Sequence, residues 1–484
     1  MTPILFRVDG NSTTGLGHIS RCLKFAYCLK YFGFNSIFLS NINNYSIEKK
    51  INESFTLIKC AELNKKKENI NLKIIRSYQK KFKSDFLILD SNNVSLKFLK
   101  LLKRINLKSL IITDLYTKGI QADYCINYNT SQKYKFKNVK NFFFGSEYVI
   151  NSLKNNINNK PKSKYITIFF GATDSKKITE KILQLIKDYT KQDFIIVLGP
   201  FNERKDLIYK KFKNFNNIKF ESNTFEIEKI LNKSKLVICS GGIFNNERVL
   251  FNLPAITISI NKIQGKILKN QAKLGLCRYL GDYKRISKKI FFNNFENILE
   301  NYQKEKQKII ENNFVDTQSS LRTILSIFIE KFKKKKKIQK ANIKDNIFLY
   351  NLIKSKNVFD NSVSKKTIKF IDYSLWFKKK LKSQTSQIYI LKILNINIGQ
   401  IRFDIIKKKI AEIDISVHHD FLDNSFGSYL LDNGIKLFSK KKKIKIFKSH
   451  VLKTNKESQK MFIENKFLLS RKNQNIIEYV KIIK

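Results

Sequence analysis

Residues 6–29 read FRVDGNSTTGLGHISRCLKFAYCL, and the apolar run Ile4–Val8 leads into them. That run predicts a short strand, and the polar, glycine-bearing segment Asp9–Gly17 predicts a loop. From Ile19 onward, apolar residues recur with the period of a helix. A strand, a loop and a helix in this order predict the opening unit of an α/β domain with a parallel sheet.

The loop of this unit has the composition of a phosphate-binding turn. Gly15 and Gly17 allow the backbone to bend and to approach a ligand closely. A helix that begins near His18 would direct its free N–H groups at an anion, and the imidazole could accept a proton near neutral pH. Taken alone this loop is a weak signal, because an isolated histidine is more often a structural hydrogen-bonding group.

Strands and helices alternate through the first 300 residues. A helix is predicted at Leu96–Lys103, and the rhythm restarts after the polar segment Ser152–Lys164. Further strands are predicted at Ser36–Leu39, Phe86–Leu89, Ser109–Thr113, Tyr165–Phe170, Phe194–Leu198 and Leu236–Cys239. We therefore expect two Rossmann-like domains, 1–152 and 160–300, that face a cleft and bind ligands at the carboxyl ends of their strands.

The pattern changes after residue 300. Residues 301–345 include KFKKKKKIQKANIK and predict a lysine-rich helical linker, since a block of like charge is usually solvated. Residues 346–484 predict a third domain of mixed α+β type. Its expected elements are antiparallel strands at Gln387–Ile393, Asn397–Asp404 and Lys409–Val417 and helices at Gly427–Phe438 and Asn455–Asn465.

The formal charge of +55 comes from 94 Lys and Arg against 39 Asp and Glu. Lysine is in large excess in every segment and is accompanied by Asn and Ile, which share its A/T-rich codons. Genomic base composition therefore accounts for the charge, and the basic residues lack the aromatic interleaving of a nucleic-acid surface. We expect no nucleic-acid partner, although a positive field would attract anionic nucleotides.

Cysteine usage and the first residues favour a cytoplasmic protein. The six cysteines form no Cys-x-x-Cys pair, and with only four histidines in the chain we expect neither a metal site nor a disulfide. The N-terminus lacks a basic segment followed by a long apolar run, so no signal peptide is expected. No window approaches 18 apolar residues, so no membrane span is expected.

The N-terminal motif resembles a known enzyme family. Its pattern is similar to the start of the UDP-2,4-diacetamido-2,4,6-trideoxy-β-L-altropyranose hydrolases of pseudaminic acid biosynthesis, and the residues that carry the likeness are Arg7, Asp9, Gly15, Gly17, His18, Arg21 and Cys22. The resemblance continues over residues 4–282 through ILDSNNVS, IITDLYTKGIQADYCINYN, FFGATDSKKIT and ICSGGIFNNERVLFNLPAITISI. It implies a glycosyltransferase-B-like fold, a UDP-activated amino sugar as substrate and no cofactor for hydrolysis.

The resemblance also implies residue roles. His18 would be the general base for water, and Asp9 would orient its imidazole or contact the sugar. Glu247 would accept hydrogen bonds from the ribose. The remaining implied contacts to substrate or nucleotide are Arg7, Gly15, Gly17, Arg21, Gly171, Thr173, Asp174, Ser240, Gly241, Gly242, Asn261 and Gln264. For Asp174 and Glu247 the structural alternative is a helix cap and a surface charge.

The chain departs from the family pattern at three places. Asn92 stands where the family has a tyrosine after its Asp-x, which puts the exact sugar in doubt. Ala172 replaces a glycine of the second loop. The family's Asn-Gln pair corresponds to Asn261 and Gln264, preferred on spacing, or to Asn270 and Gln271.

The C-terminal segment resembles the Gcn5-related N-acetyltransferases, in YSLWF, INIGQIRFD, IDISVHHDFLDNSFGSYLLDNGI and VLKTNKESQKMFIENKF. The resemblance implies acetyl-CoA as a cofactor and acetylation of the 4-amino group of a UDP-linked trideoxy sugar. The implied cofactor contacts are Val417, Ser425, Gly427, Asn455 and Ser458. Asp423 places a negative charge in the expected pyrophosphate loop, so a module kept for packing or sugar binding is the alternative. His418 and His419 are more often incidental at such a position.

Three functions compete for the first 300 residues. The first is a hydrolase that releases UDP and a free sugar, and the His18 loop favours it. The second is a UDP-sugar-dependent glycosyltransferase, which the missing tyrosine favours. The third is a basic binding protein, for which only the bulk charge speaks.

Overall fold

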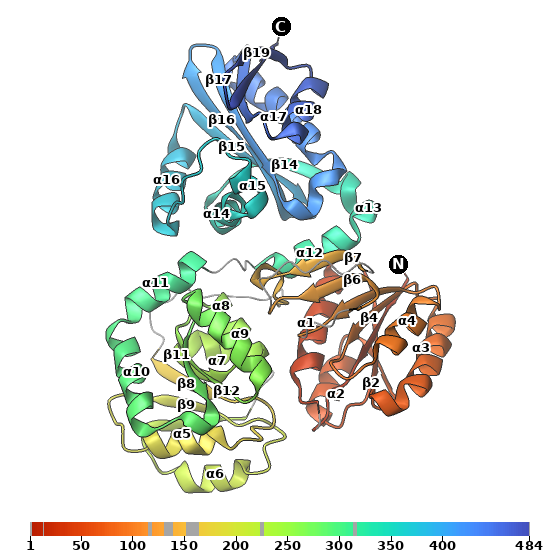
Figure 1. Cartoon of the computed structure of the whole chain (residues 1–484), viewed down its shortest axis with the longest axis vertical. Coiled ribbons are helices and arrows are strands. Elements are labelled where there is room, and N and C mark those ends of the chain that lie inside the picture. Colours follow the sequence, from red (N-terminus) through yellow and green to blue (C-terminus); the bar gives the residue numbers. More distant parts are fainter. Residues whose placement is uncertain are drawn as a thin grey trace. The chain divides into compact units, whose positions relative to one another are not determined.

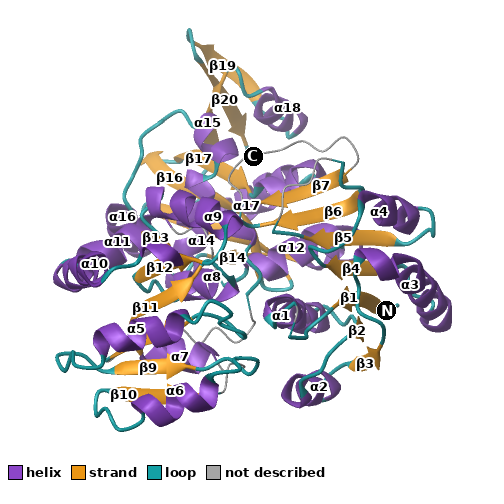
Figure 2. Cartoon of the chain, turned by 60° about the horizontal axis from the view of Figure 1, so that its bottom comes forward, coloured by secondary structure: helices purple, strands orange, loops and turns teal. Residues whose placement is uncertain are grey.

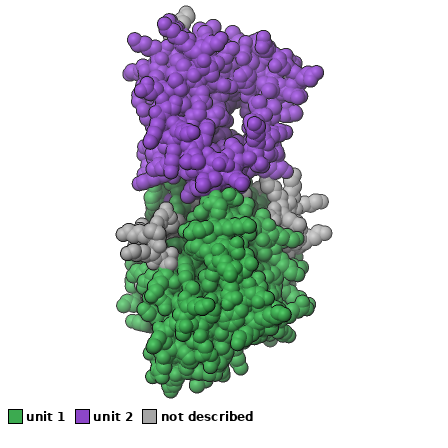
Figure 3. Space-filling model, turned by 90° about the vertical axis from the view of Figure 1, so that its left-hand side faces the viewer, with its two compact units in different colours: residues 1–320 green, residues 321–484 purple. Residues whose placement is uncertain are grey.

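The computed structural model describes residues 2–12, 14–114, 119–129, 139–151, 164–222, 227–312 and 317–483. They form two compact units, Met1–Ser320 and Leu321–Lys484 (Figure 3). The predicted linker at Ser152–Lys164 lies outside the described residues except for Lys164, as does part of the segment IITDLYTKGIQADYCINYN. The predicted division into 1–152, 160–300, 301–345 and 346–484 stays a prediction.

The first unit begins with an all-parallel sheet whose strand order is β3-β2-β1-β4-β5-β6-β7 (Figure 1). Its strands are β1 (Ile4–Val8), β2 (Ser36–Ser40), β3 (Thr56–Lys59), β4 (Phe86–Asp90), β5 (Lys108–Ile112), β6 (Ala122–Asn127) and β7 (Val139–Phe144). The helices between them are α1 (Gly17–Tyr31), α2 (Tyr45–Asn52), α3 (Glu68–Phe82) and α4 (Leu96–Lys103). In Figure 2, α1 and α2 lie on one face of the sheet and α3 and α4 on the other.

A second parallel sheet follows in the same unit, with the order β10-β9-β8-β11-β12-β13. Its strands are β8 (Tyr165–Phe169), β9 (Phe194–Val197), β10 (Ile218–Glu221), β11 (Ser234–Ser240), β12 (Ala255–Ser259) and β13 (Arg278–Asp282). The helices are α5 (Ile178–Ile186), α6 (Lys205–Phe212), α7 (Ile227–Lys233), α8 (Ile243–Leu250), α9 (Lys262–Lys273), α10 (Lys288–Glu300) and α11 (Tyr302–Asn312). In each sheet the chain adds strands on one side of the first strand and then crosses to add strands on its other side, which is the doubly wound topology. The prediction of parallel Rossmann-like sheets is therefore confirmed.

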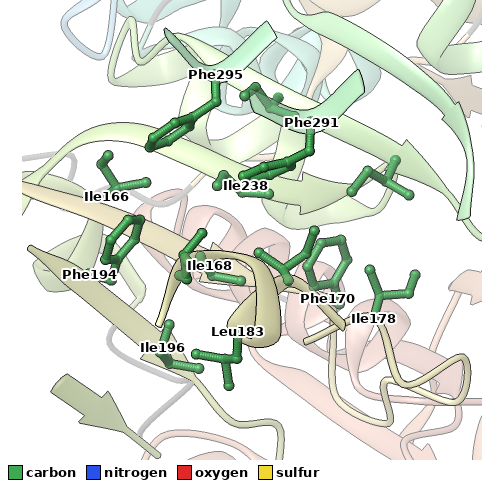
Figure 4. Packing of buried hydrophobic residues seen from close by; sticks show 14 of the residues in the cluster. Ile166, Ile168, Phe170, Ile178, Leu183, Phe194, Ile196, Ile238, Phe291 and Phe295 are labelled. Carbon is green, nitrogen blue, oxygen red and sulfur yellow. The ribbon is translucent and has the colours of Figure 1, made fainter. Parts of the chain in front are cut away.

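Aromatic residues of α10 close the core of the second sheet. Figure 4 shows the rings of Phe291 and Phe295 pointing toward Ile166 and Ile238 of the strands. The two rings stack with centroids 5.4 Å apart, and both are fully buried. Burying a phenylalanine side chain stabilises a fold by roughly 1.5–3 kcal/mol, so α10 is an integral part of this domain.

The second unit is built on a mixed sheet with the order β14-β15-β16-β17-β18-β20-β19. Its strands are β14 (Lys336–Lys340), β15 (Ser386–Ile393), β16 (Ile396–Lys407), β17 (Ile410–Val417), β18 (Ile446–Leu452), β19 (Leu468–Lys472) and β20 (Ile476–Ile482). The accompanying helices are α12 (Ser319–Ile327), α13 (Ile329–Phe332), α14 (Asn346–Lys354), α15 (Lys356–Asp360), α16 (Phe370–Lys382), α17 (Phe426–Lys442) and α18 (Lys456–Glu464).

The lysine-rich stretch differs from its prediction as a helical linker. Lys336–Lys340 form strand β14, which pairs antiparallel with β15 along its whole length. Three of the five residues of this edge strand are lysines, and charged side chains on an edge strand discourage pairing with another chain. Among the described residues, none of the helices is long and apolar enough to cross a membrane.

Candidate functional site

The loop after β1 lies at the switch point of the first sheet, between β1 and β4. Gly15 has φ of +71°, a conformation that favours glycine, and its N–H donates to the carbonyl of Asn11 at 2.8 Å. This turn carries the chain into α1, which begins at Gly17. No side chain caps this helix and its first turn has no acidic residue, so the first amides of α1 are available to an anion.

His18 lies in the first turn of α1 and meets a carboxylate from β4. Its Nδ1 is 2.6 Å from Oδ1 of Asp90, and the imidazole is 19% exposed whereas Asp90 is fully buried. An ionised carboxylate can only accept, so Nδ1 carries the proton of this bond and Nε2 keeps its lone pair. The arrangement leaves Nε2 able to accept a proton from water.

A buried network holds Asp90 in place. Nε of Arg21 donates to Oδ2 of Asp90 at 2.5 Å, and the same guanidinium donates to Asp114 at 2.7 Å and to the hydroxyl of Tyr128 at 2.6 Å. Burial alone would raise the pKa of Asp90, but the charge of Arg21 and the hydrogen bonds from Arg21 and His18 hold that pKa well below its usual range. Asp90 therefore stays ionised and keeps the imidazole in one orientation.

The expectation that Asp9 orients the imidazole of His18 needs correction. Asp9 does not reach the imidazole, because its carboxylate accepts from Arg7 and from the backbone N–H groups of Asn41 and Leu63 at 2.8 and 2.7 Å. Arg7 is fully buried and also donates to Asn71 at 2.7 Å. The pair fastens the loops after β1, β2 and β3 to one another, and Asp90 is the carboxylate that faces His18.

The second sheet places a matching loop at its own switch point, between β8 and β11. Ser240 ends β11, and Gly241 and Gly242 lead into α8, which has neither a side-chain cap nor an acidic residue in its first turn. A Cβ on Gly17 would lie 3.0 Å from Cδ1 of Ile243, the first residue of α8. Two uncapped helix N-termini therefore meet here, and the positive ends of both helix dipoles suit a diphosphate.

Glu247 is engaged by a lysine of α1. The side chain of Glu247 accepts a hydrogen bond from Nζ of Lys24, and the two side chains are 8% and 16% exposed. This ion pair joins α8 to α1. The ribose contact predicted for Glu247 would therefore have to replace or share the bond to Lys24.

The loop after β8 packs closely against Gly199. A Cβ on Gly199 would lie 2.3 Å from the carbonyl oxygens of Gly171 and Ala172, so only glycine fits. Asp174 accepts from the backbone N–H groups of Ile178 and Thr179, each at 3.0 Å. Asp174 thus caps α5, as its structural alternative predicted, and burial raises its pKa. Thr173 lies on the same loop, half-buried.

The two candidate Asn-Gln pairs have different surroundings. Asn261 caps α9 by accepting from the N–H of Gln264 at 2.9 Å, and Oε1 of Gln264 accepts from the N–H of Ile260 at 3.3 Å. Gln271 instead accepts from Asn245 at 2.5 Å and donates to Asn246 at 2.9 Å, both on α8. The alternative pair, Asn270 and Gln271, therefore supplies the glutamine beside α8, while the preferred pair forms a helix cap.

The predicted cofactor contacts of the second unit lie at the starts of two helices. Val417 ends β17, and Ser425 and Gly427 flank the first residue of α17, a helix without a side-chain cap. A Cβ on Gly427 would lie 2.8 Å from Sδ of Met461 in α18. Asn455 caps α18 by accepting from the N–H of Ser458 at 3.1 Å. The contact between Gly427 and Met461 brings the first turn of α17 against α18.

The two parallel strands beside α17 pair over only part of their length. β17 and β18 pair in parallel only from Ile410 to Glu412, and beyond that point each strand keeps only its other neighbour. The start of α17 has no side-chain cap and no acidic residue in its first turn, so its first amides could receive an anion. Asp423, in the turn before α17, is the residue that opposes a phosphate there.

His418, His419 and Asp420 form a compact cluster in the same turn. One potential ligand atom from each lies within 4.8 Å of the others, so these three side chains could hold a metal ion. Burial, then the nearby charges of His419 and Arg322, keep the pKa of His418 well below its usual range. His418 is therefore neutral and accepts from the N–H of Asp420 at 3.3 Å.

The sequence analysis matched Asp90 to the family's Asp-x-Tyr element without giving it a role, and it did not single out Asp114, Tyr128 or Lys24. A signal for Asp90 was present, because a charged residue that ends the apolar run FLILD falls at the carboxyl edge of a buried strand. Asp114 likewise lies two residues after the end of β5. Lys24 offered no signal, since one more lysine in a lysine-rich chain looks like surface charge.

The fold and this site define a class of protein. Two doubly wound parallel sheets with opposed glycine loops constitute a glycosyltransferase-B fold. In agreement, MurG of Acinetobacter baumannii has a similar fold, with a TM-score of 0.50 at 13% identity over 68% of this chain and 99% of that protein. The predicted fold of the first unit is confirmed at this level.

Comparison of sequences points to proteins without an assigned function. A family model described as a protein of unknown function, DUF354, matches residues 106–315. The uncharacterized protein MJ1062 of Methanocaldococcus jannaschii is 27% identical over 282 residues, which cover 53% of this chain and 55% of that protein. The chain thus spans about half the length of this curated relative.

A further similarity concerns a smaller part of the chain. The spermidine N-acetyltransferase of Vibrio cholerae, solved with CoA and spermine, aligns with 31% of this chain and 96% of its own length at 13% identity and a TM-score of 0.29.

Proposed function

We propose that the first unit hydrolyses a UDP-linked 2,4-diacetamido-2,4,6-trideoxy sugar to UDP and the free sugar, as in pseudaminic acid biosynthesis. The observation that carries this proposal is the His18–Asp90 pair in the first turn of α1, beside the meeting point of the α1 and α8 N-termini. A diphosphate held by those two helix ends would place the bond to the sugar near His18.

The reaction is a displacement at the anomeric carbon. Nε2 of His18 accepts a proton from water, whose oxygen forms the new bond to that carbon. The bond between the carbon and the diphosphate oxygen breaks, and its electron pair leaves with UDP. The helix dipoles stabilise the charge that develops on the leaving oxygen, so no separate acid is needed.

The test is UDP release from UDP-2,4-diacetamido-2,4,6-trideoxy-β-L-altropyranose without an acceptor. We expect release by the wild type and a loss of at least about 100-fold in His18→Ala. His419→Ala, a partly exposed histidine of the other unit, serves as the control and should retain the rate. If the wild-type protein binds UDP but releases none from this sugar, the substrate assignment is wrong.

Glycosyl transfer from a UDP-sugar is the second candidate, and the fold similarity to MurG together with Asn92 favours it. A transferase uses the same cleft but requires an acceptor hydroxyl in place of water. UDP release that appears only after an acceptor is added would favour this function over hydrolysis.

For the second unit we propose N-acetylation of a 4-amino sugar carried on UDP. Acetyl-CoA, when bound, supplies an acetyl thioester to this reaction. The amides at the start of α17 and the residues Ser425 and Gly427 would hold its diphosphate, with Val417 bordering the gap between β17 and β18. Binding of acetyl-CoA to the full chain, measured by calorimetry, tests this assignment, and a failure to bind would favour a packing or sugar-binding role.

A further inference from the structure

His450 of β18 lies between two carboxylates on an open face of the second unit's sheet. Its Nδ1 is 2.7 Å from Oε1 of Glu412 on β17, and its Nε2 is 3.4 Å from Oε2 of Glu478 on β20. The imidazole is 40% exposed. Because β18 and β20 are antiparallel, His450 and Glu478 are directly opposed partners, so the backbone itself determines this arrangement.

The position of His450 coincides with the point where two strands part. β17 and β18 stop pairing after Glu412 and Lys448, and His450 is two residues further along β18, on the same face as Lys448. Beyond the last backbone pair, the hydroxyl of Ser449 donates a hydrogen bond to the carbonyl of Ile413 at 3.3 Å. Glu412 and His450 therefore border the closed end of the gap.

The gap connects this closed end with the start of α17. From Glu412 to Val417 the strand advances five positions, which is about 16 Å at 3.3 Å per residue. An acyl thioester whose diphosphate is held at α17, as proposed above, would lie along the gap with its carbonyl near Glu412 and His450. This step rests on the proposed acetyl transfer.

The same face carries an unusual share of acidic groups for so basic a chain. Asp404 and Asp414 bind Arg402 at 2.8 and 3.0 Å, and Glu412 and Glu478 flank the imidazole. Three cations offset this charge, since Arg402 pairs as described, Lys380 contacts Asp404 at 2.6 Å and Lys448 contacts Glu478 at 3.2 Å. Glu412 and Glu478 lie beside His450, and carboxylates accept hydrogen bonds and attract cations, so this position suits an amine.

We propose that His450, held by Glu412 and opposed by Glu478, accepts the proton that a primary amine loses when the thioester acylates it. The amine nitrogen forms a bond to the acyl carbon, and the carbon–sulfur bond breaks with its electron pair on sulfur. The proton passes from nitrogen to Nε2 of His450 and then to the departing sulfur or to solvent. Glu412 holds the ring from Nδ1, and Glu478 accepts a second N–H of the amine.

The test compares full-length His450→Gln with wild type in single-turnover acetylation of UDP-2-acetamido-4-amino-2,4,6-trideoxy-β-L-altropyranose. Glu464→Gln, which removes an exposed carboxylate of α18, is the matched control and should behave as wild type. We expect His450→Gln to slow transfer by about 100-fold, while its Kd for acetyl-CoA stays within about twofold. A wild-type rate in His450→Gln would overturn the proposal.

A second readout does not depend on turnover. The chain has four histidines, so a histidine-labelled sample gives four ring signals, and His450→Gln identifies the one of interest. Addition of the amino sugar should shift that signal, whereas the N-acetylated sugar should not. If the protein acetylates the amine but this signal does not move, the role of His450 is wrong and the proposed acetyl transfer stands. If the wild-type protein neither binds acetyl-CoA nor transfers its acetyl group, both this inference and the proposed acetyl transfer are wrong.

Discussion

Nδ1 of His18 and Oδ1 of Asp90 lie 2.6 Å apart, although 72 positions separate the two residues in the sequence. The bond joins the first turn of α1 to the last residue of β4, across the switch point of the first sheet. Because Arg21 holds the second oxygen of Asp90, the carboxylate cannot rotate away from the imidazole. The structure thus orients the one histidine of the first unit.

Asp90→Asn tests this orientation. An amide can still bond to Arg21, but it lacks the charge that keeps the Nδ1 proton in place, so we expect UDP release to fall at least about 100-fold. The Kd for UDP should change by less than about threefold. Asp114→Asn, which removes a partner of Arg21 but no contact to His18, is the control and should lose less than about tenfold. Equal losses in both variants would show that the network matters only for folding.

We expect substitutions of Lys24 and of Glu247 to change UDP binding in opposite directions. Glu247→Gln should weaken UDP binding about tenfold if the carboxylate accepts from the ribose. Lys24→Met frees that carboxylate and should tighten UDP binding, while lowering the thermal midpoint because Glu247 is left buried without its cation. Lys30→Met, on the same helix, is the control. Calorimetric titration with UDP decides, and weaker binding in Lys24→Met would contradict the ribose contact.

Alanine substitutions at two glycines distinguish an effect on stability from an effect on ligand binding. Gly199→Ala forces a methyl to within 2.3 Å of the carbonyls of Gly171 and Ala172, so we expect a loss of about 1–3 kcal/mol in the free energy of unfolding. A methyl at Gly242 meets no atom within 4 Å, so Gly242→Ala should fold normally. It should nevertheless bind UDP at least about tenfold more weakly, because the methyl would occupy diphosphate space. Unchanged UDP binding would move the diphosphate away from α8.

His418 predicts a pH dependence of stability in the second unit. Burial keeps the folded pKa well below 6.5, whereas the unfolded side chain takes up a proton near that value. The stabilisation is therefore complete above pH 6.5 and is lost as the pH falls below it, by about 1.4 kcal/mol per pH unit. His418→Gln should lack this slope. Calorimetric unfolding of both proteins at pH 6.5 and 5.5 measures this slope. Equal slopes in wild type and His418→Gln would contradict the prediction.

Much of the first unit follows from local patterns. The strands at Phe86 and Phe194 and the helix at Leu96–Lys103 were predicted because apolar periodicity and the flanking polar residues are properties of short segments. The Gly15–His18 turn was predicted for the same reason. The edge strand at Lys336–Lys340 was missed, because its lysines look like a solvated linker until β15 provides a partner.

The partners of the site residues did not follow from the sequence. The family resemblance implied that Asp9 orients the imidazole or contacts the sugar, yet Asp9 pairs with Arg7, and Asp90 is the carboxylate beside the imidazole. Asn261 and Gln264 were preferred by spacing, yet Gln271 reaches α8. In both cases the partners come from other elements of the fold, Asp90 from β4 and Asn246 from α8, and local sequence does not show which elements meet.

The sequence by itself determined the order of strands and helices, the glycine loops at their ends and the helix that begins at His18. These features depend on residues within a few positions of one another. The tertiary structure alone decided which carboxylate orients His18, that Lys24 meets Glu247, and that His450 lies between Glu412 and Glu478. Side chains from neighbouring strands and helices come together in space whatever their distance along the chain, and only the order in which strands pair determines which of them meet.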